Sequence, residues 1–344
     1  MKLAFLLPGG GRSGGVRCTV IAANRLLARG HEVRILYRRT GFHYRGLFSR
    51  VTTRILHGRP NNWLDDFHGS ALAYGDIREV EFPPNEILIG AGMWCSAQLG
   101  KLDSLPNPKL QYIHGLTPWD PDLMDAALSL PLPKIGVSHV VGEKVTACYD
   151  ESLFLGVVHN GIERNQYFPS VPDGQRDGIG TIYGRHPAKA PAVILESLAR
   201  LRGELPEVPQ YIFGAPLRPR TIPRSAYRQD PSVSEARDLY SRSLVWILAS
   251  RSEGFPGPVL EAMACGCAVV ATDCGGPRDV IVDGRNGFLV DVDNVDQIVD
   301  RVVRLIRDED LRRRFSREGQ ETAGRFSWDN AANQLEEVLG SLIQ

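Results

Sequence analysis

The feature that most constrains the fold is a repeated alternation of short apolar runs with segments of helical periodicity. In the first half of the chain, Val16–Arg29 has apolar residues at helical spacing and ends at Gly30. Short buried strands separated by segments long enough for crossover helices predict a parallel sheet with helices on both faces. The expected strands of this half are Leu3–Leu7, Val33–Tyr37, Ile87–Ile89, Leu110–Ile113 and Ile135–Val137.

A second series of the same kind follows a polar stretch, Val171–Gly178, which has the composition of a linker. Its expected strands are 180–183, 211–213, 244–248, 268–271 and 288–290, and its expected helices are 192–202, 259–265 and 295–308. We therefore predict an α/β protein with two doubly wound Rossmann-like domains, residues 1–165 and 166–327. A length of 344 residues fits two domains. The ligand site is expected in the cleft between the domains, at the carboxyl ends of the strands.

Composition excludes several classes of protein. The 40 Lys+Arg residues balance 40 Asp+Glu residues, which argues against a nucleic-acid partner. No apolar stretch approaches the roughly 20 residues that span a bilayer. The apolar N-terminus meets Pro8 before a signal-peptide core is complete, so we interpret it as a strand. Six scattered cysteines fit a reducing cytoplasm, and no His or fourth Cys stands at zinc-ligand spacing near Cys265, Cys267 and Cys274. A cytoplasmic location is expected.

The first glycine loop, Gly9–Gly14, matches the G-x-G-x-x-G pattern of dinucleotide sites. In such sites an acidic residue follows the second strand, whereas here Arg38 and Arg39 follow it. An NADP-dependent oxidoreductase could use these arginines and stays an alternative. The pair Gly14-Gly15 stands directly before the expected helix and is the better candidate for phosphate contact through backbone N–H groups.

Two cations follow the first strand of the second series. Arg185 and Lys189 lie four residues apart on the connection at that strand's carboxyl end, and Lys189 is one of only six lysines. Arginine can bind a phosphate through two parallel N–H bonds, and lysine binds it as a point charge. The pair is a candidate diphosphate site, and two solvated loop cations are the alternative.

The most informative segment runs from Ser252 to Gly266. It places Glu253 in a Gly/Pro-rich turn and Glu261 in the first turn of a helix expected to begin near Pro258. The helix N-terminus offers donors to phosphate, and the carboxylates offer acceptors to hydroxyls of a sugar and a ribose. Glu261 could instead serve the helix dipole.

The two glutamates, eight positions apart, resemble the E-x7-E signature of family 4 retaining glycosyltransferases of the GT-B fold. The resemblance extends over nearly the whole chain and has a second set of motifs. These are Gly14–Val16 with Arg29–Val33, Tyr112–Gly115, Val158–Ile162 with Phe168-Pro169, Gly184-Arg185 with Lys189, Thr272–Gly276 and Asp283–Val290.

The resemblance implies roles for individual residues. Glu261 would hold the ribose, Arg185 and Lys189 the diphosphate, and Glu253 with the backbone of Gly254 and Phe255 the donor sugar. From the N-terminal domain, Gly14 and Gly15 would close over the phosphates and His114 would contact the sugar. The catalytic set would be Glu253, His114, Arg185 and Lys189. The helix within 328–344 would pack back on the N-terminal domain. The sequence departs from the family pattern at Ala190, where glycine is usual, and in the short interval from Arg185 to Lys189.

The resemblance also implies the reaction. A hexose-type sugar would move from a nucleotide-diphosphate donor to a glycan, lipid-linked or small-molecule acceptor, with retention and in polysaccharide biosynthesis. No cofactor or metal is expected, and the acids of Asp291–Asp293 and Asp308–Asp310 are expected to be solvated rather than metal ligands. The alternatives are the NADP-dependent oxidoreductase and a nucleotide-sugar-binding protein without turnover. The nucleotide base, the sugar, the acceptor and the oligomeric state stay open.

An arginine-rich stretch has a separate interpretation. Residues 33–64 contain seven arginines and no acid, and Tyr44, Leu47, Phe48, Val51 and Ile55 fall on one face of an expected helix. A basic amphipathic segment can lie on an anionic membrane, here through residues 38–59, which suits a lipid-linked acceptor. The alternative is a domain helix with its apolar face in the core.

Overall fold

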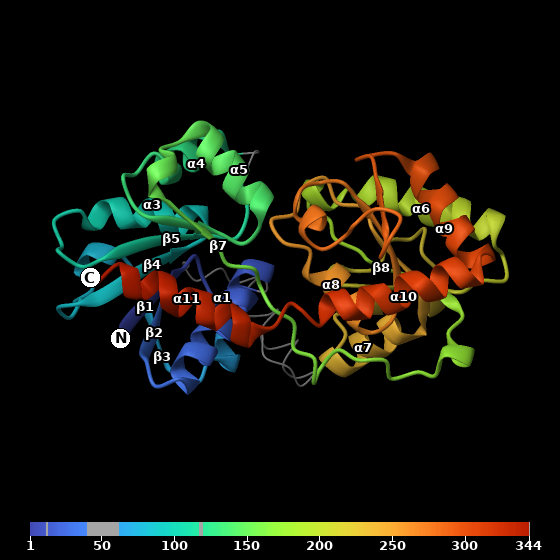
Figure 1. Ribbon diagram of the computed structural model, residues 1–344, viewed down its shortest axis with the longest axis horizontal. Helices are drawn as coiled ribbons and strands as arrows, with labels where there is room; N and C mark the ends of the chain where they lie inside the picture. Colours follow the sequence, from blue (N-terminus) through green and yellow to red (C-terminus); the bar gives the residue numbers. More distant parts are fainter. Residues whose placement is uncertain (12, 40–61, 117–119, 344) are drawn as a thin grey trace. The chain divides into compact units, whose positions relative to one another are not determined.

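The computed structural model describes residues 1–11, 13–39, 62–116 and 120–343 and divides into two compact units (Figure 1). Unit 1 comprises Met1–Asn160 and Trp328–Gln344, and unit 2 comprises Gly161–Ser327. The division therefore lies at Asn160 rather than at residue 165. The backbone explains the difference, because the N–H of Ile162 donates to the carbonyl of Phe326 at 3.1 Å, which ties this segment to unit 2.

Unit 1 is built on a seven-stranded parallel sheet in the order β3-β2-β1-β4-β5-β6-β7. The strand order reverses between β1 and β4, which makes this the topological switch point. The strands are β1 (Lys2–Leu7), β2 (Glu32–Arg38), β3 (Ser70–Tyr74), β4 (Glu86–Ala91), β5 (Lys109–Ile113), β6 (Lys134–Gly136) and β7 (Phe154–Val157). The described helices are α1 (Gly14–Ala28), α3 (Met93–Leu99), α4 (Pro121–Leu128), α5 (His139–Cys148) and α11 (Trp328–Ser341), with short 3-10 turns η1 (Trp63–Asp66), η2 (Ile77–Glu79), η3 (Gly100–Leu102) and η4 (Glu151–Leu153).

Unit 2 repeats the design with a six-stranded parallel sheet in the order β10-β9-β8-β11-β12-β13. Its switch point lies between β8 and β11. The strands are β8 (Gly178–Ile182), β9 (Gln210–Gly214), β10 (Tyr227–Gln229), β11 (Ser243–Leu248), β12 (Ala268–Thr272) and β13 (Phe288–Val290). The helices are α6 (Pro191–Glu204), α7 (Val233–Arg242), α8 (Gly257–Ala264), α9 (Val295–Arg307) and α10 (Glu309–Ala323), with 3-10 turns η5 (Asp173–Gln175), η6 (Pro187–Lys189), η7 (Arg224–Ala226) and η8 (Gly276–Asp279).

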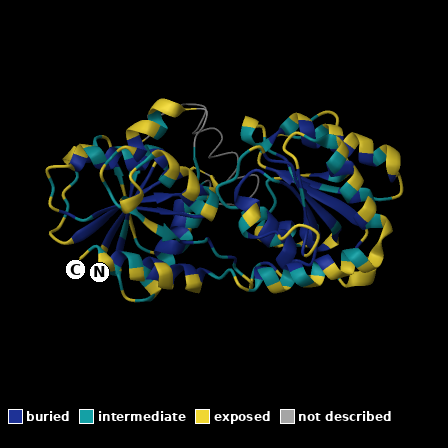
Figure 2. Cartoon of the chain, turned by 45° about the horizontal axis from the view of Figure 1, so that its top comes forward, coloured by how far each residue is buried: buried dark blue, intermediate teal, exposed yellow. Residues whose placement is uncertain are grey.

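Both sheets are buried on two faces, as Figure 2 shows by the dark strands and the exposed outer sides of the helices. In β11, Val245 and Ile247 pack into one apolar cluster, and Trp246 packs into the cluster on the opposite face. Alternation along a strand that is apolar throughout is expected of a parallel sheet covered by helices on both sides. The prediction of two doubly wound α/β domains is confirmed.

Three strands were not predicted: β3, β7 and β10. All three are edge strands that pair on one side only: β3 and β7 are the two edges of the sheet of unit 1, and β10 is one edge of the sheet of unit 2. In β3, Leu72 is 48% exposed. Edge strands bury less surface and need no continuous apolar run, so the sequence pattern that marks the central strands is absent there.

The stretch Val171–Gly178 is not a linker between the units. It lies within unit 2, and Gly178 begins β8. The buried guanidinium of Arg176 donates from Nη1 to the carbonyl of Cys265 at 2.9 Å and from Nη2 to that of Ser243 at 2.6 Å. Residues 171–178 are therefore a polar loop that Arg176 holds to the core of unit 2.

Helix α11 lies against α1 in unit 1 (Figure 1). Its apolar stripe is buried, and Glu336 accepts hydrogen bonds from Nη1 of Arg29 at 2.6 Å and from Nε2 of His31 at 2.7 Å. The hydrogen bond from His31, followed by the interactions with Arg29, lowers the pKa of Glu336.

We expect Glu336→Gln to lower the free energy of unfolding of unit 1 by about 1 kcal/mol at pH 7, because a neutral amide weakens both contacts at a side chain that is 29% exposed. The pKa of Glu336 in the folded state lies below its value of about 4.3 in the unfolded state. The extra stability of the wild type over the glutamine variant is therefore fully present above about pH 4.3 and is lost as the pH falls through the folded-state pKa. Urea unfolding at pH 7 and at acidic pH measures both effects. Glu337→Gln, exposed on the same helix, is the control; equal midpoints for the two variants would contradict the expectation.

The helix predicted within the arginine-rich stretch falls on residues 40–61, outside the described residues. None of the helices that the structure describes combines the length and the apolar character needed to cross a membrane.

Candidate functional site

The loops that follow β8 and β11 lie side by side at the switch point of unit 2. The two strands are parallel neighbours, with Thr181 in register with Ile247. Their carboxyl ends therefore meet at one edge of the sheet, which is where doubly wound sheets bind ligands. The first loop carries Arg185 and Lys189, and the second carries Glu253.

The structure brings Lys189 and Glu253 into contact, although 64 residues separate them. The ammonium Nζ lies 2.5 Å from Oε1 of Glu253, and the hydroxyl of Ser250 donates to the same oxygen at 2.6 Å. The Glu253 side chain is 10% exposed, whereas that of Lys189 is 39% exposed. The carboxylate is thus held by two donors, and the lysine keeps access to solvent.

A third loop, after β12, clamps the backbone of Glu253. The N–H of Gly276 donates to the carbonyl of Glu253 at 3.0 Å, and Gly275 forms an isolated bridge with Glu253. Gly275 has φ 112°, a conformation that favours glycine. A Cβ atom at Gly276 would lie 2.7 Å from the carbonyl oxygen of Gly254. In the sequence, only the family resemblance indicated this loop. The close approach to the Gly254 carbonyl is the physical reason for a glycine at position 276.

Arg185 is exposed on the β8 loop. Its Nη2 lies 3.5 Å from the carbonyl oxygen of Leu217, at the limit of a hydrogen bond. The guanidinium is therefore loosely held, unlike the buried Arg176, and its position at the strand end suits a ligand contact.

The departure at Ala190 has a backbone consequence. Ala190 has φ 44° and ψ 57°, in the left-handed region, and it is fully buried at the N-cap of α6. Glycine adopts this conformation freely, while alanine pays about 1 kcal/mol. The chain therefore keeps the left-handed turn after Lys189, and Ala190 is strained in it.

The prediction that Glu261 lies in the first turn of its helix is wrong. Helix α8 begins at Gly257, so Pro258 is its second residue and Glu261 stands in the second turn. The helix dipole acts mainly in the first turn and therefore explains Glu261 less well. The hydroxyl of the buried Tyr240 donates to Oε2 of Glu261 at 2.9 Å, and burial raises the pKa of Tyr240 well above its usual value. No sequence signal pointed to Tyr240.

The two acidic motifs that resemble metal sites have protein partners. Asp293 forms an ion pair with Arg251 at 2.8 Å, and Asp291 accepts a hydrogen bond from Gln297 at 2.7 Å. Asp308 accepts from the N–H of Leu311 at 3.0 Å and caps α10. These interactions give Asp291, Asp293 and Asp308 roles in the fold.

The second group of predicted residues lies in unit 1. Ser13 caps α1 by accepting from the N–H of Val16 at 3.3 Å, so Gly14 and Gly15 form the first turn. A Cβ at Gly14 would meet no atom within 4 Å, and one at Gly15 would approach Cβ of His114 at 3.5 Å. The structure therefore brings the Gly14-Gly15 turn and His114 together.

One glycine of the dinucleotide-like pattern is required by packing. A Cβ at Gly10 would lie 2.9 Å from the side chain of Asn62, and the carbonyl of Gly10 accepts from the N–H of Trp63 at 3.3 Å. After β2, the guanidinium of Arg38 lies over the ring of Trp94 at 5.1 Å. Both features have structural explanations that need no dinucleotide.

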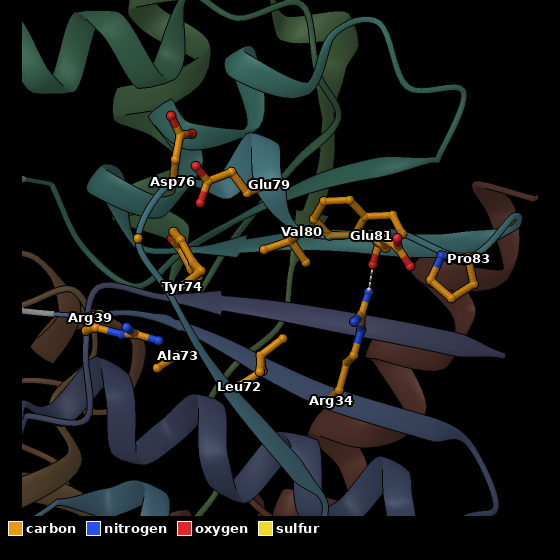
Figure 3. Close-up of a pocket in the computed structure, with 12 residues that line it drawn as sticks. Arg34, Arg39, Leu72, Ala73, Tyr74, Asp76, Glu79, Val80, Glu81 and Pro83 are labelled. Atoms are coloured by element: carbon orange, nitrogen blue, oxygen red, sulfur yellow. Dashed lines mark hydrogen bonds between the residues drawn. The ribbon is translucent and has the colours of Figure 1, made fainter.

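A hollow of about 720 Å³ lies at the β3 edge of unit 1 (Figure 3). Arg34 at its rim donates to the carbonyl of Glu81 at 2.9 Å and pairs with Glu86. None of the residues predicted to bind the nucleotide-sugar lines this hollow, although Arg39, which the NADP alternative would use, does. It is therefore separate from the groups described above.

Comparison with known proteins places these groups in context. The family model described as "Glycosyl transferases group 1" matches residues 227–322, within unit 2. The chain is 26% identical to a D-inositol 3-phosphate glycosyltransferase of Xylanimonas cellulosilytica, over 96% of this chain and 92% of that protein. It is 32% identical to the uncharacterized glycosyltransferase MJ1178 of Methanocaldococcus jannaschii, over 32% of each chain. For MJ1178 and two further D-inositol 3-phosphate glycosyltransferases, the alignment spans 32%, 43% and 48% of the relative's own length, so the chain spans less than half of these curated relatives.

Among solved structures, Anabaena Alr3699/HepE in complex with UDP-glucose has a TM-score of 0.77 and 17% identity, over 99% of this chain and 100% of that chain. The two units thus have the GT-B fold, and residues 227–322 match the model of the group 1 glycosyl transferases.

Proposed function

We propose that this protein is a retaining, metal-independent glycosyltransferase of family 4 that transfers a hexose-type sugar from a nucleotide-diphosphate donor. The observation that carries the proposal is the contact between Lys189 and Glu253 at the switch point of unit 2. A cation suited to a diphosphate and a carboxylate suited to sugar hydroxyls meet there, at the edge where such sheets bind ligands. The group 1 domain and the glycosyltransferase relatives support the same activity.

Each side chain has a proposed role. Glu261, held by Tyr240, binds the ribose hydroxyls, and Arg185 with Lys189 binds the diphosphate. Glu253 and the backbone of Gly254 and Phe255 bind the sugar. From unit 1, we propose that Gly14 and Gly15 contact the phosphates through backbone N–H groups and that His114 contacts the sugar.

The proposed chemistry is front-face substitution at the anomeric carbon. The bond from this carbon to the β-phosphate oxygen breaks, and the acceptor oxygen forms its bond on the same face. The acceptor proton passes to the departing phosphate oxygen. Negative charge builds on the leaving group, and we propose that Arg185, Lys189 and the N-terminus of α8 stabilise it in place of a metal ion.

The donor and acceptor are proposed by class only. Uridine diphosphate sugars are the first candidates, because the solved relatives with this fold include complexes with UDP and UDP-glucose. The acceptor is proposed to be a glycan, a lipid-linked sugar or a small molecule, in polysaccharide biosynthesis. A cytoplasmic location, with peripheral contact to anionic membrane through residues 38–59, stays a proposal, and most of that segment lies outside the described residues.

We expect Arg185→Ala to weaken UDP binding about tenfold, equivalent to about 1.4 kcal/mol, because a bidentate cation is lost from the diphosphate. Isothermal titration calorimetry measures the Kd. Arg313→Ala, which removes an arginine that is 68% exposed on α10, should leave the Kd unchanged. Equal affinities of the Arg185 variant and the wild type would remove Arg185 from the diphosphate site.

A thermal-shift screen with UDP- and GDP-sugars, UDP, GDP and NADPH tests the function as a whole. Stabilisation by a nucleotide-sugar, followed by sugar transfer, supports the proposal. Stabilisation by NADPH alone favours the oxidoreductase. Binding of a nucleotide-sugar with no transfer or hydrolysis favours a binding protein without turnover.

A further inference from the structure

His114 has one buried ring nitrogen without a hydrogen-bond partner in the part of the chain that the structure describes. This atom is Nδ1. The other ring nitrogen, Nε2, lies 3.0 Å from the hydroxyl oxygen of Thr19 on α1. Thr19 is fully buried. The two nitrogens of one imidazole therefore have different surroundings.

The hydrogen bonds of Thr19 favour one position for the proton of the His114 imidazole. A hydroxyl has one hydrogen, and that of Thr19 is donated to the carbonyl of Gly15 at 2.9 Å, the usual contact of a helical threonine with the residue four positions earlier. The oxygen of Thr19 is then left as an acceptor toward His114. With the Thr19 hydrogen donated to Gly15, the contact at 3.0 Å is a hydrogen bond when Nε2 carries the hydrogen of the imidazole.

The charge state of His114 completes the assignment. Burial lowers the pKa of His114 to about 4, so the imidazole is neutral at physiological pH. A neutral imidazole has one N–H, and its second nitrogen is an acceptor. With the hydrogen on Nε2, Nδ1 presents a lone pair. A buried acceptor without a partner costs about 1–3 kcal/mol, so such a group calls for a ligand donor.

The ring plane is restrained as well. The rings of Tyr112 and His114 have centroids 4.3 Å apart, and Gly15 also approaches the histidine side chain, since a Cβ at Gly15 would lie 3.5 Å from that of His114. Rotation of the imidazole that would exchange the two nitrogens is therefore hindered.

We propose that Thr19 is a positioning residue that fixes His114 as the Nε2–H tautomer, so that Nδ1 accepts a hydrogen bond from a hydroxyl of the bound donor sugar. The proposal rests on the proposed function, in which His114 contacts that sugar. It adds a requirement on the substrate, because the sugar group that meets His114 must carry a hydrogen.

Nitrogen NMR of the ligand-free protein tests the tautomer without any substrate. In protein labelled with ¹⁵N-histidine, the His114 signals are assigned by their loss in His114→Gln, since the chain has eight histidines. We expect Nδ1 to resonate as an unprotonated nitrogen and Nε2 as a protonated one at pH 7. Thr19→Val, which keeps the shape and removes the oxygen, should shift the population toward the Nδ1–H form, and Thr19→Ser should retain the wild-type pattern. An Nδ1–H tautomer in the wild type, or the same pattern in the valine variant, would overturn the proposal.

Kinetics test the consequence. With a nucleotide-sugar that is turned over, we expect kcat/KM to fall about tenfold in Thr19→Val and to return to within about twofold of wild type in Thr19→Ser, while the Kd for UDP, which lacks the sugar, stays constant. Equal loss in both variants would assign Thr19 a packing role only. Absence of turnover with every donor would refute the proposed function, and the NMR result would still decide the role of Thr19 toward His114.

Discussion

Replacement of Glu253 by glutamine is expected to lower kcat by about 10²- to 10³-fold while the Kd for UDP stays within about twofold of wild type. Glutamine keeps the shape and can still accept from Ser250, but it removes the negative charge beside the position proposed for the sugar. An anomeric carbon gains positive charge as the leaving group departs, so a fixed carboxylate stabilises the transition state more than the ground state. Free UDP lacks the sugar and should not depend on this charge.

Steady-state kinetics and calorimetry with UDP measure the two quantities separately. Glu196→Gln, an exposed position on α6, is the matched control and should leave both unchanged. Thermal unfolding of each variant shows whether the loss of the ion pair with Lys189 also costs stability. Near-normal turnover in the glutamine variant would exclude Glu253 from the reaction.

The second large effect is expected from Gly276→Ala. The new Cβ would lie 2.7 Å from the carbonyl oxygen of Gly254, closer than real Cβ atoms approach backbone, and 3.0 Å from that of Glu253. The Glu253-Gly254 backbone must therefore move, and with it the carboxylate. We expect kcat/KM to fall about 10- to 100-fold, because small displacements of positioning groups have effects of this size, and the free energy of unfolding to fall by about 1–3 kcal/mol.

Gly203→Ala is the matched control for this substitution. Gly203 lies near the end of α6, and a Cβ there would meet no atom within 4 Å. Alanine should stabilise the helix by about 0.5–1 kcal/mol and leave the kinetics unchanged. Activity is compared at a temperature where both variants are folded. Wild-type kcat/KM in Gly276→Ala would show that the β12 loop does not position Glu253.

The central strands could be predicted because burial on both faces demands apolar residues, as in Leu3–Leu7 and Leu244–Leu248. The edge strands β3, β7 and β10 could not be predicted, because they lack a continuous apolar run, whereas the edge strand β13 has one in Phe288–Val290. Part of the site could be predicted, because Glu253 stands in a Gly/Pro-rich turn and Lys189 is one of only six lysines, and both follow the ends of strands. The contacts of Tyr240 with Glu261 and of Thr19 with His114 could not be predicted. The two residues of each pair are 21 and 95 positions apart, and only the tertiary structure brings them together.

The scarcity of lysine shows how much composition alone can predict about a functional residue. It drew attention to the half-exposed Lys189, yet two other lysines are buried and have structural partners. Lys109 donates to the carbonyl of Leu105 at 2.7 Å, and Lys134 donates to that of Leu130 at 2.8 Å. Burial lowers the pKa of both ammonium groups. Rarity therefore marked residues with specific partners, and only their location distinguishes a candidate ligand contact from a structural tie.

The division of the chain has a consequence for biosynthesis. Unit 2 is continuous in sequence, whereas unit 1 closes only when α11 returns to α1. Domains generally fold as units during synthesis, the earlier one first. Here the ribosome delivers the seven strands of unit 1 long before α11, so the nascent N-terminal half leaves the exit tunnel with the surface of α1 that α11 contacts still exposed to water. Unit 2 is therefore expected to reach its native state first, and the earlier half of the polypeptide depends on chaperones, or on tolerance of an open face, until translation supplies α11.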